Sequence, residues 1–168
     1  MVEAVTGDDV GTVMRERLFE PLGMHDTRLA REGQPGPRLV HVYNGTEDLT
    51  WLDVYWVRAA GGVTSTVVDV ATFYQALFAG EVLDEERLAA MTQIRDDDLL
   101  QWNGYGLGLA AVETDCGTAL GHSGRLPGLA TEAWSMPDRD RSVVVFINGD
   151  GHGAGGTLDV VREAALCG

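Results

Sequence analysis

The sequence predicts an α+β fold in which an antiparallel β-meander packs with helices. Apolar residues recur at helical spacing in the first hundred residues, whereas from Tyr105 onward the period changes to that of strands. The connections between those strands are short, which indicates antiparallel neighbours. A last helical pattern at 157–166 closes the chain, and helices followed by a meander favour α+β over a parallel sheet.

Capping signals predict two helices in the first half of the chain. Asp8 or Asp9 can cap a helix that runs to about Glu20. Thr66 begins the clearest helix, with a start that resembles a capping box, and Gly80 suits its end.

The segments around these helices are less regular. Residues 28–60 show little periodicity, with a short strand predicted at 39–43 and an aromatic-rich stretch at 51–57 that should pack on another part of the fold. A shorter helix is predicted at 84–94. The acidic loop at 95–98 should face solvent rather than hold a metal, because its aspartates lack an ordered ligand spacing.

The second part of the chain predicts four strands, at 105–112, 118–122, 129–136 and 142–148, with turns at 115–117 and 137–140. The last strand reads S-V-V-V-F-I-N and is apolar on both faces, which is typical of a central strand covered on both sides. Its meander neighbour occupies only one of its edges. The other edge needs a further strand, unless 39–43 fills that place, because an open edge of this composition invites association.

Composition excludes several classes of function. The 168 residues suit one domain, the net charge is −14, and all 12 basic residues are arginine, so no mechanism within this chain can use a lysine amine. The acidic balance argues against a nucleic-acid partner and against an anionic membrane surface. No apolar run approaches the about 20 residues of a spanning helix. The first residues lack the features of a signal peptide, and the compartment stays open.

The two cysteines, Cys116 and Cys167, are too few for a disulfide framework. We expect two free thiols rather than a disulfide, although the sequence leaves both states possible.

The main candidate site lies in L-G-H-S-G-R-L-P-G at 120–128, at an expected turn or strand edge. His122 can hold or relay a proton, the Ser123 hydroxyl can donate to a carboxylate, and Gly124 lets a ligand approach the backbone. A plain turn at a strand end is the alternative. An internal catalytic triad built on Ser65 or Ser123 is a further alternative, although neither serine lies in a G-x-S-x-G elbow.

Other motifs carry less weight. The stretch G-H-G-A-G-G at 151–156 matches G-x-G-x-x-G, but a dinucleotide site needs a second parallel strand and an acidic residue about 20 positions further on. We therefore expect a flexible loop and no cofactor. The four histidines lack metal-ligand spacing, so no metal site is expected. His25 and His41 should be structural or surface residues, and His152 should be solvated.

Taken together, four stretches resemble the serine β-lactamase and penicillin-binding-protein superfamily, and within it the branch of class C β-lactamases, D-alanyl-D-alanine carboxypeptidases and esterases. They are E-P-L-G-M-H-D-T (20–27), A-A-G-G-V-T-S-T-V-V-D-V-A-T-F (59–73), Y-G-L-G-L (105–109) and G-H-S-G-R-L-P-G (121–128). Their order and intervals also agree. The resemblance implies one partial domain over 1–168 that is similar to the C-terminal half of the β-lactamase/transpeptidase-like fold. Residues 1–104 would be its mainly helical and loop part, and 105–168 its strands and last helix.

The resemblance also implies roles for the candidate residues, since the family's third motif is Lys-Thr-Gly, His-Thr-Gly or His-Ser-Gly. His122 would assist proton transfer and the local positive field, and Ser123 would donate to a substrate carboxylate or acyl group. The backbone N–H of Arg125, which follows Gly124, would be one oxyanion donor. Whether the Arg125 guanidinium also holds a substrate carboxylate stays open.

The family's nucleophile lies in Ser-x-x-Lys and a tyrosine in Tyr-x-Asn, and neither motif occurs in this sequence. We therefore expect the C-terminal portion of a serine hydrolase that acts on β-lactams, D-Ala-D-Ala peptides or small esters and is inactive alone. A small-molecule or peptide substrate would meet it only in the complete enzyme.

A non-catalytic binding or interaction module is the alternative, with a partner paired on an open strand. The partner at 142–148 would be a missing N-terminal half or a second copy. A soluble monomer that folds cooperatively would favour the module, and folding only with a partner chain would favour the hydrolase.

Overall fold

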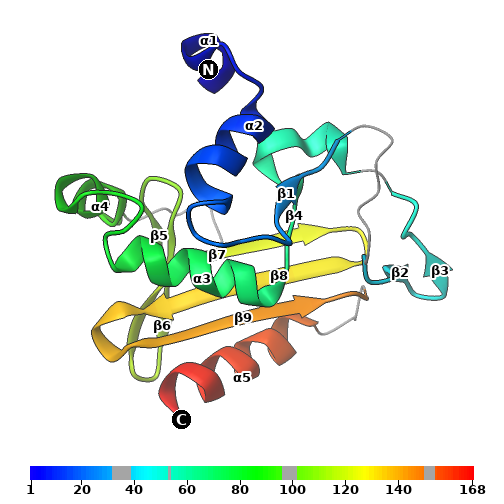
Figure 1. Ribbon diagram of the computed structural model, residues 1–168. Helices are drawn as coiled ribbons and strands as arrows, with labels where there is room; N and C mark the ends of the chain where they lie inside the picture. The colour runs from blue at the N-terminus through cyan, green and yellow to red at the C-terminus, as the bar shows by residue number, and fades with distance from the viewer. Residues whose placement is uncertain (32–38, 53, 96–101, 150–153) are drawn as a thin grey trace.

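A five-stranded sheet with a long helix on each face dominates the computed structural model, which describes residues 1–31, 39–52, 54–95, 102–149 and 154–168 (Figure 1). Helix α3 (Val67–Phe78) crosses one face of the sheet and helix α5 (Ala154–Cys167) covers the other. This arrangement confirms the predicted α+β class and its antiparallel meander.

The five strands follow one another in chain order, and every neighbouring pair is antiparallel: β5 (Gly104–Tyr105), β6 (Ala110–Thr114), β7 (Gly117–Leu126), β8 (Leu129–Met136) and β9 (Arg141–Ile147). The single strand predicted at 105–112 is wrong, because a turn with Gly108 at φ 83° separates β5 from β6. The strand predicted at 118–122 is too short, because β7 continues to Leu126.

The core consists of two apolar layers, one on each face of the sheet. On one face, Tyr74 and Leu77 of α3 pack with Leu109 and Ala133. On the other face, Trp134 packs with residues that include Leu166 of α5. Ala133 and Trp134 are consecutive residues of β8, and successive side chains of a strand point to opposite faces.

The helix predicted from Asp8 or Asp9 to about Glu20 is confirmed by α2 (Val10–Met14), which continues as a π-helical segment (Arg15–Phe19). A short helix that was not predicted, α1 (Val2–Thr6), precedes it. The Asp9 carboxylate accepts the Thr12 N–H at 3.2 Å and so caps α2.

Between α2 and α3 the chain forms short elements: β1 (Arg28–Leu29) paired with β4 (Val63–Thr64), β2 (Tyr43–Asn44) paired with β3 (Glu47–Asp48), and a 3₁₀ segment (Tyr55–Ala60). The strand predicted at 39–43 is wrong apart from Tyr43, whose partner is the adjacent β3. The aromatic stretch was expected to pack, but Trp51 and Trp56 are 71% and 68% exposed.

The predicted start and end of α3 are confirmed. Thr66 Oγ1 accepts the Asp69 N–H at 3.0 Å at the start of α3, and Gly80 follows its end at φ 79°. Helix α4 (Glu85–Met91) is capped by Asp84 and is shorter than predicted.

The predicted glycine-rich loop is partly helical, because α5 begins at Ala154, whereas 151–153 lie outside the described residues. His152 and most of the predicted acidic loop also lie outside the described residues.

Strand β9 has covered faces and an open edge. Val143 packs in the layer that contains Leu166, and Val144 in the layer that contains Leu77, which confirms the two covered faces. Within the described part of the chain, β9 pairs with β8 only, and the nearest segment on its other side is a parallel bridge between Tyr43 and Gly149 beyond the strand's end. The expected second neighbour is therefore missing along β9 itself.

The two cysteines form a disulfide, Cys116–Cys167, with their Cα atoms 5.6 Å apart. The expectation of two free thiols is wrong. The residues are 51 positions apart in the sequence, and the fold brings the turn between β6 and β7 against the last turn of α5. Sequence spacing carries no information about that approach.

Candidate active site

Strand β7 extends beyond its neighbour β6, and this leaves part of one edge open. β6 pairs with β7 only as far as Ala110 and Gly121. From His122 to Leu126, β7 pairs with β8 on its other side, and no strand of the described residues pairs with the edge that faces β6. The candidate residues therefore lie inside a strand, at an open edge, rather than at a turn. Backbone groups along such an edge can pair with an extended ligand.

The His122 imidazole is held in one orientation by two hydrogen bonds. Its Nδ1 lies 2.6 Å from the Ser123 carbonyl oxygen. A carbonyl can only accept, so Nδ1 carries the proton. In the neutral ring, Nε2 then accepts from the Tyr105 hydroxyl, which lies 3.1 Å away. If Nε2 carries a proton, it donates that proton to the Tyr105 oxygen instead. The hydrogen bond between Nε2 and the Tyr105 oxygen can therefore have its donor on either side.

Two aromatic rings border the imidazole. The Trp102 ring centroid lies 4.8 Å from that of His122, and the Tyr105 centroid lies 5.8 Å away and meets it edge-on. Trp102 and Tyr105 also stack on each other at 5.4 Å. All three rings are half-buried. The contacts with Trp102 and Tyr105 hold the His122 ring at the open edge of β7.

Tyr74 of α3 is buried in the apolar layer that contains Leu77 and Leu109. Burial, and to a smaller extent electrostatic repulsion from Tyr105, raise the pKa of Tyr74 to about 12. The phenol of Tyr74 therefore stays neutral through the physiological range.

The other three candidates follow His122 along β7. Ser123 is half-buried and pairs with Glu132 of β8, and Arg125 is exposed. A Cβ at Gly124 would lie 2.9 Å from Thr131 Oγ1, so the strands approach closely there. Because successive residues of a strand alternate in direction, Ser123 points away from the face that carries His122. The two side chains can flank a ligand at the edge, but they do not form a nucleophile–base pair.

The alternative residues have other surroundings. The Thr27 hydroxyl has one proton and donates it to Asp69 at 2.6 Å, so the Ser65 hydroxyl, 2.6 Å from Thr27, donates to Thr27. Ser65 is thus tied into a structural network. His25 is exposed, and the exposed His41 pairs with Asp48 at 2.9 Å, which confirms both as surface residues.

Sequence reasoning missed Trp102 and assigned no role to Tyr105. Tyr105 begins the Y-G-L-G-L stretch, which was the only available signal. Trp102 carries no local motif. Among the described residues, no group of three or more His, Cys, Asp or Glu side chains is arranged to hold a metal ion. In the same part of the chain, no helix is both long and apolar enough to cross a membrane.

The antiparallel sheet between α3 and α5, with a His-Ser-Gly sequence on an open strand, is the arrangement of the β-lactamase-like fold. The Beta-lactamase family model matches residues 1–166, and the chain belongs to that family. It lies within the superfamily of serine β-lactamases and penicillin-binding proteins, as the resemblance predicted.

Relatives and solved structures agree with this assignment. The chain is 26% identical to the D-aminopeptidase of Brucella anthropi over 163 residues, which cover 90% of this chain and 29% of that protein. A D-stereospecific amidohydrolase from Streptomyces sp. superposes with a TM-score of 0.85 at 28% identity, over 99% of this chain and 51% of that one. The D-amino acid amidase of Ochrobactrum anthropi SV3 gives a TM-score of 0.85 at 28% identity, over 97% and 54%. The chain therefore spans under a third of that curated relative and about half of these solved structures.

Proposed function

We propose that this chain forms one wall of the active site of a serine hydrolase that cleaves amide bonds of D-amino acid residues. The observation that carries the proposal is the open edge of β7, where a single imidazole tautomer is fixed beside backbone groups that can pair with an extended substrate. The D-aminopeptidase, amidohydrolase and amidase names of the relatives support the choice of a D-configured amide. D-Ala-D-Ala peptides, β-lactams and small esters are related acyl donors.

Each candidate residue has a role in this proposal. His122 exchanges a proton at Nε2, and the Ser123 hydroxyl donates to a substrate carboxylate or acyl group. The Arg125 N–H donates to the oxyanion, and Gly124 leaves space for the substrate backbone.

The nucleophile comes from outside this sequence, which has no lysine and so cannot contain Ser-x-x-Lys. Its serine oxygen forms an ester with the acyl carbon while the amine leaves with a proton, and water then hydrolyses the ester.

In this function, residues 1–168 form one part of a single domain, which is completed by polypeptide that pairs with β9. The open edge of β9 and the partial coverage of the relatives support this completion. The same edge favours a second candidate function, a non-catalytic module that binds a partner by strand addition. A homo-oligomer joined through β9 is a third outcome, and sedimentation of the isolated chain distinguishes a monomer from these assemblies.

The test compares the full-length protein with the isolated chain. We expect the full-length protein to hydrolyse D-alanine p-nitroanilide in preference to the L isomer and to show an acyl adduct by mass spectrometry. His122→Ala should lower kcat/KM by about 10²-fold or more, which is typical of a lost proton-transfer group. The matched control His41→Ala, at an exposed histidine, should leave it unchanged. An acyl adduct on the isolated chain would contradict the proposed division of roles.

A further inference from the structure

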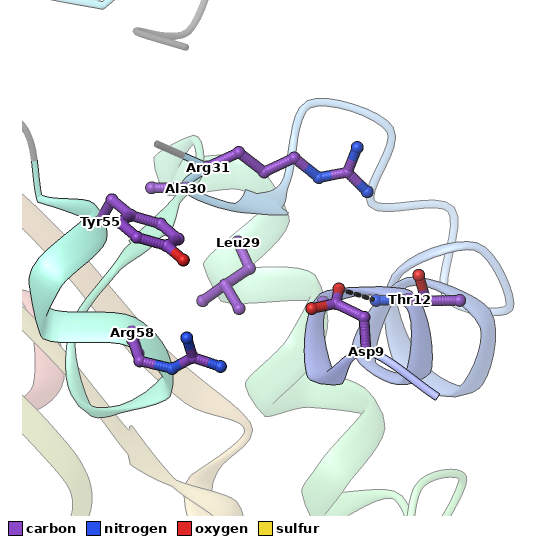
Figure 2. Close-up of a pocket in the computed structure, with 8 residues that line it drawn as sticks. Asp9, Thr12, Leu29, Ala30, Arg31, Tyr55 and Arg58 are labelled. Atoms are coloured by element: carbon purple, nitrogen blue, oxygen red, sulfur yellow. Dashed lines mark hydrogen bonds between the residues drawn. The ribbon is translucent and has the colours of Figure 1, made fainter. Parts of the chain in front are cut away.

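A hollow of about 330 Å³ lies on another part of the molecule, between the start of α2, strand β1 and the 3₁₀ segment (Figure 2). Its volume falls at the lower end of the range for small-molecule sites, about 300–1,000 Å³. None of its lining residues belongs to the five-stranded sheet. The candidate residues of β7 are not among the residues that line it.

The hollow carries opposite charges on opposite sides. Figure 2 shows the Arg58 guanidinium and the Tyr55 hydroxyl directed inward from the 3₁₀ segment, and the Asp9 carboxylate facing them from the start of α2. Leu29 provides an apolar surface between them, and Arg31 lies at the rim. Among the described residues, no ion pair joins Asp9 to Arg58. The two charged groups therefore line the same hollow without contacting each other.

Each charge is held in place by its own neighbours. One Asp9 oxygen accepts the Thr12 N–H at 3.2 Å. Arg58 Nη2 contacts Glu3 Oε1 at 3.1 Å. A guanidinium has five N–H donors, and one contact with Glu3 leaves donors to meet a second carboxylate.

The Arg58 backbone is strained, with φ 48° and ψ −139°. Its carbonyl accepts the Gly62 N–H at 2.6 Å, and a Cβ at Gly62 would lie only 2.7 Å from that carbonyl. A non-glycine residue in such a conformation costs of order 1–3 kcal/mol, and such strain concentrates at ligand sites. The tight turn holds a large cationic side chain where glycine would be easier to accommodate.

We propose that this hollow binds an amino-acid-sized zwitterion, with its carboxylate on Arg58, its ammonium on Asp9 and an apolar side chain over Leu29. A simple anion would meet Asp9, and a simple cation would meet Arg58 and Arg31. A ligand that carries both charges satisfies both sides. Arginine suits the carboxylate end because its planar fork can bind both oxygens.

The test titrates the full-length protein with D-leucine and L-leucine by calorimetry. N-acetyl-leucine lacks the ammonium and 3-methylbutylamine lacks the carboxylate, and each should bind at least about tenfold more weakly than leucine. Asp9→Asn keeps a good helix cap but removes the charge. Arg58→Gly removes the guanidinium and relieves the backbone strain, so the melting temperature should not fall. Both variants should weaken leucine binding by at least about tenfold.

The controls locate the site. Asp138→Asn and Arg139→Gln, in an exposed turn, should leave leucine binding unchanged, and so should His122→Ala. The proposal is overturned if leucine does not bind, if it binds no better than its two analogues, or if Asp9→Asn and Arg58→Gly bind like the wild type. Loss of binding in His122→Ala alone would assign the ligand to the β7 edge and would also overturn it.

Discussion

At the scale of single residues, the Tyr105 hydroxyl contacts Nε2, the His122 nitrogen that the Ser123 carbonyl leaves free. Tyr105→Phe removes this donor and keeps the ring that stacks on Trp102. We expect kcat/KM of the full-length protein to fall about 3- to 10-fold, which corresponds to one hydrogen bond of about 1 kcal/mol. Long-range ¹H–¹⁵N spectra should still show the Nδ1-protonated ring, because the Ser123 carbonyl still fixes it. Tyr43→Phe, at an exposed tyrosine, should change neither quantity.

Tyr74 gives a prediction about alkaline pH. Its pKa of about 12 in the fold lies above the usual value near 10, so between these values the folded state keeps a proton that the unfolded state loses. The stabilisation is fully present below pH 10 and is lost as the pH rises through 12. It should amount to about 2–3 kcal/mol at most. Urea unfolding of the wild type and of Tyr74→Phe should give a difference that changes over this window, whereas Tyr43→Phe should follow the wild type.

Only part of the site could be predicted from the sequence. His122, Ser123, Gly124 and Arg125 are consecutive, so a local pattern could single them out. Trp102 and Tyr105 lie outside this stretch, and only the fold brings their rings against His122. No spacing rule along the chain encodes such a contact.

At the scale of elements, Asp69 joins the loop before β1 to the first turn of α3. Its Oδ2 accepts the Asp26 N–H at 3.2 Å and the buried Thr27 hydroxyl at 2.6 Å. Asp69→Ala leaves both donors without this acceptor, and each unsatisfied group costs about 1–3 kcal/mol. We expect a loss of about 2–4 kcal/mol in the free energy of unfolding, whereas Asp138→Ala in the exposed turn should cost under about 0.5 kcal/mol. A loss at Asp69 as small as that of the control would show that these hydrogen bonds contribute little to the free energy of unfolding.

Helix starts were predictable because a cap is local. Asp9, Thr66 and Asp84 each accept an N–H within their own first turn. The first and last residues of β5, β6 and β7 could not be predicted in this way, since they depend on pairing with neighbouring strands. The open edge at His122 arises because β6 begins at Ala110, after a turn of the chain, and not from any feature of residues 122–126.

At the scale of the whole molecule, the disulfide secures α5 to the sheet. In the chain-entropy account, closing a loop of this length stabilises the fold by about 4 kcal/mol. We expect the double variant Cys116→Ser/Cys167→Ser to lose about that amount in urea unfolding, and reduction of the wild type to have a similar effect. Equal stability with and without reducing agent would contradict this contribution.

The overall class was predictable because helical periods come first, strand periods follow from Tyr105, and one helical period closes the chain. Long-range features could not be predicted. They include the disulfide and the position of β9 at the edge of the sheet. The prediction that β9 has covered faces succeeded because both of its faces are apolar. Its edge pairing depends on residues far away in sequence.

The Cys116–Cys167 bond also changes what a protease can separate. It turns residues 116–167 into a closed covalent loop that contains β7, β8, β9 and α5. A single cut after the exposed Arg139, between β8 and β9, therefore opens the loop without releasing a fragment. Trypsin-nicked protein should run as one band on a denaturing gel without thiol and as two bands after reduction, because the disulfide joins the fragment with β5–β8 to the fragment with β9 and α5.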